Sequence, residues 1–123
     1  MKKIELVFIF DLENLDLLYD YFILSQLCRI LDISDLKYIK NIKEDFTREI
    51  YLLVKTNILG HEKNAKIRKV FNKEVNPTKM AYVISFYEYS FLNLNNYRKI
   101  LDNLFKKLKA DKAYINLNED KIF

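Results

Sequence analysis

The sequence predicts a single α/β domain in which a mostly parallel sheet of about four strands is flanked by helices. Two short, almost continuously apolar runs, residues 3–10 and 81–87, have the length and composition of strands buried on both faces. Segments with apolar residues at three- and four-residue spacing separate these runs and indicate helices. Strands joined through helices imply crossover connections and a largely parallel sheet. One glycine and one proline argue against a sandwich or barrel, which needs frequent turn residues.

The predicted order is strand, helix, helix, strand, helix, strand, helix, strand, within one compact domain spanning residues 1–123. Apolar spacing and β-branched content assign the elements around the two apolar runs. They are a helix over 15–31, a helix over 34–46, a strand over 47–59, a helix over 61–73, a helix that begins near Asn93 or Asn95, and a strand over 113–117. The segment 47–59 also fits a helix, and its β-branched residues favour the strand.

The composition of the chain indicates where in the cell the protein is expected to lie and whether it contacts a membrane. The net charge is +4 and the pI is about 9.0, a mildly basic balance typical of a soluble protein with surplus lysine. Cys28 is the only cysteine, so no internal disulfide can form and a reducing compartment is expected. The longest apolar zone, residues 15–31, contains three charged residues, which is incompatible with a membrane span. These features predict a cytoplasmic protein with no membrane contact.

Two acidic residues follow the two predicted central strands. Asp11 comes directly after the first apolar run, and Glu88 directly after the second. Ligands of parallel sheets gather at the carboxyl ends of the strands, so the two carboxylates are candidates for a shared divalent cation or for catalysis. The alternative is that they cap helices or stay solvated.

Lysines and tyrosines supply the candidate binding surface. On a helix over 61–73, four lysines lie on or near one outer face, where they are either a solvated face or a site for an anionic partner. Two tyrosines follow the second apolar run on one side of the chain, as interface anchors or as the end of the core. The candidate binding residues are Lys63, Lys66, Lys69, Lys73, Tyr87 and Tyr89.

The segment Phe8-Ile-Phe-Asp-Leu-Glu-Asn-Leu15 resembles the opening of NYN/PIN-like nuclease domains. Lys63-Asn-Ala-Lys-Ile67 is similar to their central segment, and residues 82–91 to their late strand. This resemblance implies metal-dependent RNA cleavage, with Mg²⁺ or Mn²⁺ at Asp11 and Glu88. The central aspartate of the family falls near Lys66, so two of the three or four expected carboxylates remain.

The same two apolar runs also resemble the signature strands of RNA-recognition motifs. Val7-Phe-Ile-Phe-Asp-Leu12 is similar to the first signature strand of that family, and Met80-Ala-Tyr-Val83 to part of the second. The resemblance implies aromatic side chains presented by both strands for base stacking. The glycine of the second signature is missing from this sequence.

The incomplete catalytic set favours a small non-enzymatic binding module with no cofactor. Such a module would engage a macromolecular partner, as an inhibitor, an immunity-type protein or a subunit of an assembly, through lysine-rich helix faces and the tyrosine cluster. Two alternatives stay open. One is an NYN/PIN-like metal-dependent ribonuclease with a degenerate site, and the other is a non-catalytic nucleic-acid-binding protein. The expected partner is therefore a protein or a nucleic acid.

Overall fold

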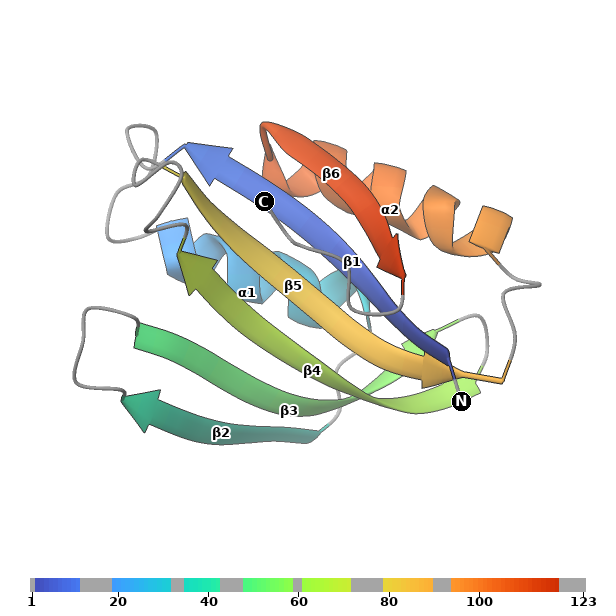
Figure 1. Cartoon of the computed structure of the whole chain (residues 1–123), viewed down its shortest axis with the longest axis horizontal. Coiled ribbons are helices and arrows are strands. Elements are labelled where there is room, and N and C mark those ends of the chain that lie inside the picture. The colour runs from blue at the N-terminus through green and yellow to red at the C-terminus, as the bar shows by residue number, and fades with distance from the viewer. Residues whose placement is uncertain are drawn as a thin grey trace.

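Six strands and two helices make up the part of the chain that the computed structural model describes (Figure 1). The structure describes residues 2–11, 19–31, 35–42, 48–58, 61–71, 79–89 and 94–117. In chain order the elements are β1 (Lys2–Asp11), α1 (Tyr19–Ile30), β2 (Asp35–Ile42), β3 (Arg48–Ile58), β4 (His61–Phe71), β5 (Lys79–Glu88), α2 (Leu94–Leu108) and β6 (Lys112–Leu117).

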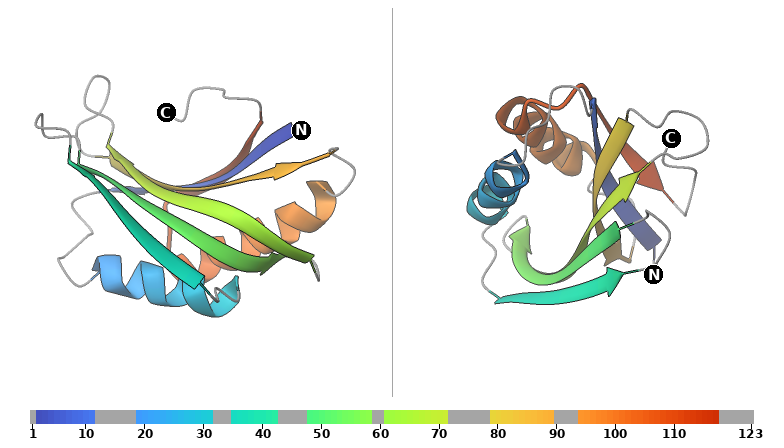
Figure 2. Two further views of the ribbon diagram at one scale, coloured as in Figure 1. Left: turned by 90° about the horizontal axis from the view of Figure 1, so that it is seen from below. Right: turned by 90° about the vertical axis from the view of Figure 1, so that its left-hand side faces the viewer.

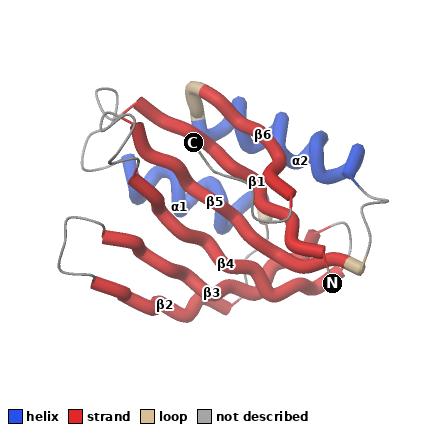
Figure 3. Tube along the Cα trace, viewed as in Figure 1, coloured by secondary structure: helices blue, strands red, loops and turns tan. Residues whose placement is uncertain are grey.

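The strands form one sheet in the order β2-β3-β4-β5-β1-β6, and every neighbouring pair is antiparallel. The predicted mostly parallel sheet of about four strands, with helices on both faces, is therefore wrong. The strands dominate the described part of the chain, and both helices lie against the same side of them (Figure 3). The fold is an antiparallel sheet with one helical layer.

Part of the error concerns which strands are neighbours in the sheet, because two helical crossovers are present in the described part of the chain. α1 connects β1 to β2, α2 connects β5 to β6, and the pairings show that each helix joins two strands of the same direction. In both cases at least one strand of opposite direction lies between the joined strands. This split arrangement of strand-helix-strand units makes every sheet neighbour antiparallel.

Two predicted helices, over 34–46 and 61–73, are strands in the structure, namely β2 and β4. The lysine-rich sequence of β4, which also contains a glutamate and an alanine, has modest strand propensity, but β4 pairs with β3 on one side and with β5 on the other. Such pairing and burial override intrinsic preference in a sheet. The two buried apolar residues of β4, Ala65 and Ile67, are two positions apart, which is the strand period.

The remaining elements agree with the sequence in type and approximate bounds. The two apolar runs are β1 and β5, the ambiguous segment 47–59 is a strand, and both α1 and α2 are helices. Asn93, one of the two predicted starts of the last helix, lies outside the described residues, as does the side chain of Cys28. Within the described residues, neither helix has the length and apolarity needed to cross a membrane.

The main core lies between the sheet and the two helices, which share one side of the sheet in both views of Figure 2. Alternate residues of β1 and β5 face this core, as the strand period requires. Helix α2 presents buried residues at three- and four-residue spacing, which confirms the helix predicted to begin near Asn93 or Asn95. The core members from these three elements are Ile4, Leu6, Phe8, Phe10, Met80, Tyr82, Ile84, Phe86, Tyr97, Leu101, Leu104 and Leu108.

The other side of the sheet, called the far face here, is formed by the intervening residues of the same strands. No described helix covers it. Its centre is a small apolar cluster of Val7, Ile9, Ala81 and Val83, with Val70 and Tyr114 packed against them. Because both sides of β1 and β5 contain buried apolar residues, these two strands are nearly continuously apolar in sequence.

Helix α2 ends with a lysine in the left-handed region of backbone conformation. Lys109 has φ of 56°, and the backbone amide of Ala110 donates to the carbonyl of Phe105 at 3.3 Å. This hydrogen bond and the positive φ define a helix C-terminal motif that usually contains glycine. Lysine at this position carries the steric cost of its Cβ atom.

We expect Lys109→Gly to raise the free energy of unfolding by about 0.5–1 kcal/mol, because glycine removes the clash at positive φ. Lys107→Gly is the matched control inside the last turn of α2, and it should lower the same quantity by about 1 kcal/mol. Urea denaturation of the three proteins measures both changes. Equal destabilisation by the two substitutions would contradict this account of the helix end.

Candidate anion-binding site

A row of four polar residues crosses four neighbouring strands on the far face. Lys66 of β4 lies opposite Ser85 of β5, Ser85 lies opposite Glu5 of β1, and Glu5 lies opposite Asn116 of β6. Directly paired residues project from the same side of a sheet. Glu5, Ser85 and Asn116 are buried, whereas Lys66 is exposed. The row therefore leads from a buried carboxylate to the protein surface.

Glu5 is the centre of this row, and its carboxylate is held by four side chains. Its Oε2 atom accepts from Ser85 Oγ at 2.8 Å and from Arg68 Nη2 at 3.0 Å, and it lies 3.8 Å from Lys3 Nζ. Its Oε1 atom accepts from Asn116 Nδ2 at 3.1 Å. A buried carboxylate costs several kcal/mol unless it is paired and hydrogen-bonded, and these contacts supply that compensation.

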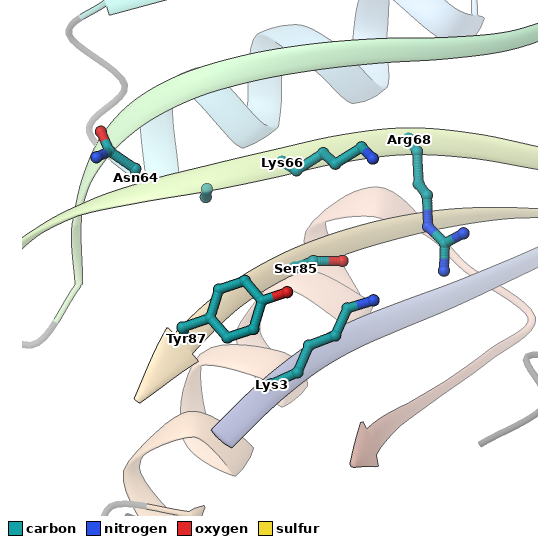
Figure 4. Close-up of a pocket in the computed structure, with 7 residues that line it drawn as sticks. Lys3, Asn64, Lys66, Arg68, Ser85 and Tyr87 are labelled. Carbon is teal, nitrogen blue, oxygen red and sulfur yellow. The ribbon is translucent and has the colours of Figure 1, made fainter. Parts of the chain in front are cut away.

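A hollow of about 320 Å³ lies at the exposed end of the row, between β1, β4 and β5. The cationic ends of Lys3, Lys66 and Arg68 gather around the hydroxyl of Ser85 (Figure 4). No acidic residue occurs among the described residues of its lining. These lining residues are Lys3, Asn64, Ala65, Lys66, Arg68, Ser85 and Tyr87.

The formal charges of the described side chains in and directly behind this hollow sum to a positive value even when the buried carboxylate is included. Lys3, Lys66 and Arg68 contribute three positive charges to the lining, and Glu5 behind them contributes one negative charge, which leaves +2. Arg68 has five N–H donors in a planar fork, a geometry that suits carboxylate and phosphate oxygens. The arrangement can therefore hold an anionic group.

Tyr87 adds aromatic surface to this hollow, and Tyr89 is a second exposed tyrosine two residues further along the chain. Tyr87 is 54% exposed, lines the hollow and is paired with Lys3 across β5 and β1, and Tyr89 is 88% exposed. The structure thus places both rings at the surface and not at the end of the core. Exposed tyrosines of this kind are effective contact residues because they bury a large area at a small cost in side-chain entropy.

The predicted lysine face is wrong, because residues 61–71 form a strand. Lys66 is on the far face with the hollow, whereas Lys63 and Lys69 have the parity of the core residues Ala65 and Ile67. Lys63 pairs with Glu88, and Lys69 lies over the ring of Tyr82 at 5.9 Å. Lys73 lies outside the described residues.

The expected meeting of Asp11 and Glu88 is also wrong. β1 and β5 are antiparallel, and their register pairs Lys2 with Glu88 at one end and Asp11 with Lys79 at the other. The two carboxylates therefore lie at opposite ends of the strand pair and cannot share one ion. Among the described residues no group of three or more histidine, cysteine or acidic side chains is placed to hold a metal.

Each of the two acids has a local structural role. The backbone amide of Asp11 donates to Asp111 Oδ2 at 2.7 Å, which ties the end of β1 to the start of β6. Glu88 accepts from the hydroxyl of Tyr97 and forms an ion pair with Lys63, so it joins β5, α2 and β4 at the other end. Burial raises the pKa of Tyr97, and its hydrogen bond to Glu88 and the negative charge there raise it further.

The structure also tests the geometry implied by the RNA-recognition resemblance. Phe8, Phe10 and Tyr82, the aromatic residues of the two similar segments, are buried beneath the helices. They cannot stack on a base from that position. The exposed aromatic residue at the basic hollow is Tyr87, which lies further along β5 than the second of these segments.

Sequence reasoning missed most of the residues that build the site, namely Lys3, Glu5, Arg68, Ser85 and Asn116. One signal was present: Glu5 interrupts the first apolar run between Ile4 and Leu6. A charged residue inside a buried strand requires partners, and so predicts a polar cluster. The partners themselves are 63, 80 and 111 residues away in sequence for Arg68, Ser85 and Asn116, and the pairing of strands alone brings them together.

Comparison of the chain with protein-family models, with curated proteins and with solved structures finds no match.

The Glu5–Arg68 pair can be tested by a double-mutant cycle. We expect Arg68→Gln to lower the free energy of unfolding by roughly 2–3 kcal/mol, because it removes one partner of a buried carboxylate. In the Glu5→Gln background the same change should cost at least about 1 kcal/mol less, since the buried charge is no longer present. Urea denaturation of the four proteins measures this coupling. Additive effects would show that the two side chains do not interact.

Tyr97 predicts a pH dependence of stability. Its pKa is raised in the folded state, so the stabilisation is present below the unfolded value of about 10 and is lost as the pH rises through the folded value. The destabilisation caused by Tyr97→Phe should therefore be smaller at about pH 11 than at about pH 8. Urea denaturation at the two pH values measures the change, with Tyr89→Phe as the control for loss of one phenol. An unchanged Tyr97→Phe penalty would contradict the assignment.

Proposed function

We propose that this chain is a non-enzymatic binding module that engages the anionic part of a macromolecular partner through the hollow on the far face. The observation that carries the proposal is the convergence of Lys3, Lys66 and Arg68 in one hollow beside the exposed ring of Tyr87. Clustered positive charge attracts anionic partners and raises their rate of association.

This surface replaces the lysine-rich helix face as the proposed contact region. Of the three predicted lysines that the structure describes, Lys66 lines the hollow, and of the two predicted tyrosines Tyr87 lines it. A metal-dependent nuclease at Asp11 and Glu88 has no support, since these carboxylates are at opposite ends of β1 and β5.

Lys66→Gln is the variant that tests the proposal, because Lys66 is exposed and its replacement leaves the Glu5 contacts in place. The probes are fluorescein-labelled single-stranded RNA, single-stranded DNA, duplex DNA and a polyglutamate peptide. We expect saturable binding to at least one probe at low salt, weakened several-fold by the substitution. For a nucleic acid, the slope of log affinity against log salt should fall by about 0.7–0.9.

Lys107→Gln is the matched control, because it removes the same charge from an exposed position on α2, on the other side of the sheet. It should leave the affinity unchanged. Two results would overturn the proposal: no binding of any probe at low salt, or an equal loss of affinity in the two variants.

A further inference from the structure

We propose that the anionic group held in this hollow is the terminal phosphate of a nucleotide, with the base packed on the ring of Tyr87. This inference rests on the proposed function and names the chemistry of its ligand. The same phosphomonoester occurs on a free nucleoside monophosphate and at the phosphorylated 5′ end of a nucleic-acid strand. Both sources present a dianionic phosphate joined through a sugar to an aromatic base.

The charge of the site selects the phosphomonoester. The lining and the carboxylate behind it sum to +2, from Lys3, Lys66 and Arg68 against Glu5. A phosphomonoester carries about −1.5 to −2 near neutral pH, whereas a carboxylate or a phosphodiester carries −1. A dianionic phosphomonoester therefore matches the formal charge of these four side chains more closely than either monoanion does.

The donors of the site also suit a group with three terminal oxygens. The Nη2 atom of Arg68 donates to Glu5, and the planar fork of the guanidinium has further N–H groups. Lys3 and Lys66 approach from two different strands, β1 and β4, with Arg68 beside Lys66 on β4 (Figure 4). Three cationic donors from different directions match a tetrahedral phosphate better than a planar carboxylate, which a single arginine already satisfies.

The size of the hollow and the position of Tyr87 define the rest of the ligand. About 320 Å³ lies at the lower end of the range for small-ligand sites, so the hollow holds a single nucleotide unit and not a length of chain. The ring of Tyr87 is half-exposed at one side of the cations (Figure 4). A base is the flat, apolar group that stacks on such a ring, and a phosphoserine side chain offers none.

Isothermal titration calorimetry with five small probes tests the proposal on the intact chain. The probes are AMP, cyclic AMP, adenosine, ribose 5-phosphate and a phosphoserine peptide. AMP should bind at least about tenfold more tightly than each of the others. Cyclic AMP retains the base but carries a monoanionic phosphodiester, ribose 5-phosphate lacks the base, and adenosine lacks the phosphate.

Two pairs of variants assign the binding to the hollow. Tyr87→Leu should weaken AMP at least about fivefold, the lower limit expected for one stacked base, whereas Tyr89→Leu should not, since Tyr89 is exposed and does not line the hollow. Lys66→Gln should weaken AMP and Lys107→Gln should not. Tyr87 and Lys66 are exposed, so these substitutions spare the core.

The two sources are separated by a single-stranded oligonucleotide with and without a 5′ phosphate. Tighter binding of the phosphorylated strand than of AMP identifies a strand end as the ligand, and equal binding identifies the nucleotide unit alone. Equal affinity for AMP and cyclic AMP, preference for the phosphoserine peptide, or indifference to Tyr87→Leu would overturn the inference. If polyanions bind through Lys66 while AMP does not, the inference fails and the proposed function stands.

Discussion

The antiparallel pairing of β1 with β5 is the constraint on which the rest of the structure depends. Its register runs from Lys2 opposite Glu88 to Asp11 opposite Lys79, so it fixes which end of each strand meets which end of the other. β4 then pairs with the outer side of β5, and β6 with the outer side of β1. This single ladder therefore places the basic start of β1 beside the tyrosine-bearing end of β5.

The same pairing gives the two sides of the sheet different compositions. One side of β1 and β5 is covered by α1 and α2 and forms most of the core. The other side combines a small apolar cluster with the polar row that ends at Lys66. Most of the buried apolar side chains that stabilise the fold thus lie under the helices, whereas the charged and aromatic residues of the proposed binding surface lie at one end of the opposite face.

Local patterns in the sequence predicted most elements but could not predict their neighbours. The apolar runs of β1 and β5 and the periodic spacing of α2 are strong local signals, and all three elements are present. The type of β4 was predicted incorrectly because its lysines, glutamate and alanine suit a helix locally, whereas its pairing with β3 and β5 decides the outcome. Parallel order was inferred from the helical connections, which are compatible with a strand inserted between the connected pair.

The candidate site depended on the same non-local information. Asp11 and Glu88 drew attention because each follows a buried strand, but that reasoning assumes parallel strands whose carboxyl ends meet. Lys3, Arg68 and Ser85 are unremarkable in sequence, and their proximity follows from the pairing of three strands. Lys66 and Tyr87 were identified from composition and alternation. They line the same hollow because β4 pairs with β5, and neither sequence pattern predicts that pairing.

Glu5 has a consequence for the fidelity of folding. Side chains alternate between the two sides of a strand, so a slip of β1 by one position would turn this carboxylate towards the helices. There it would lose its hydrogen bonds to Ser85, Arg68 and Asn116. An unpaired charge would then be buried among the aromatic and aliphatic side chains of the main core. The apolar residues on both sides of β1 tolerate such a slip, whereas one acidic residue penalises it. Glu5 thereby discriminates between the native alignment and its nearest misaligned competitor.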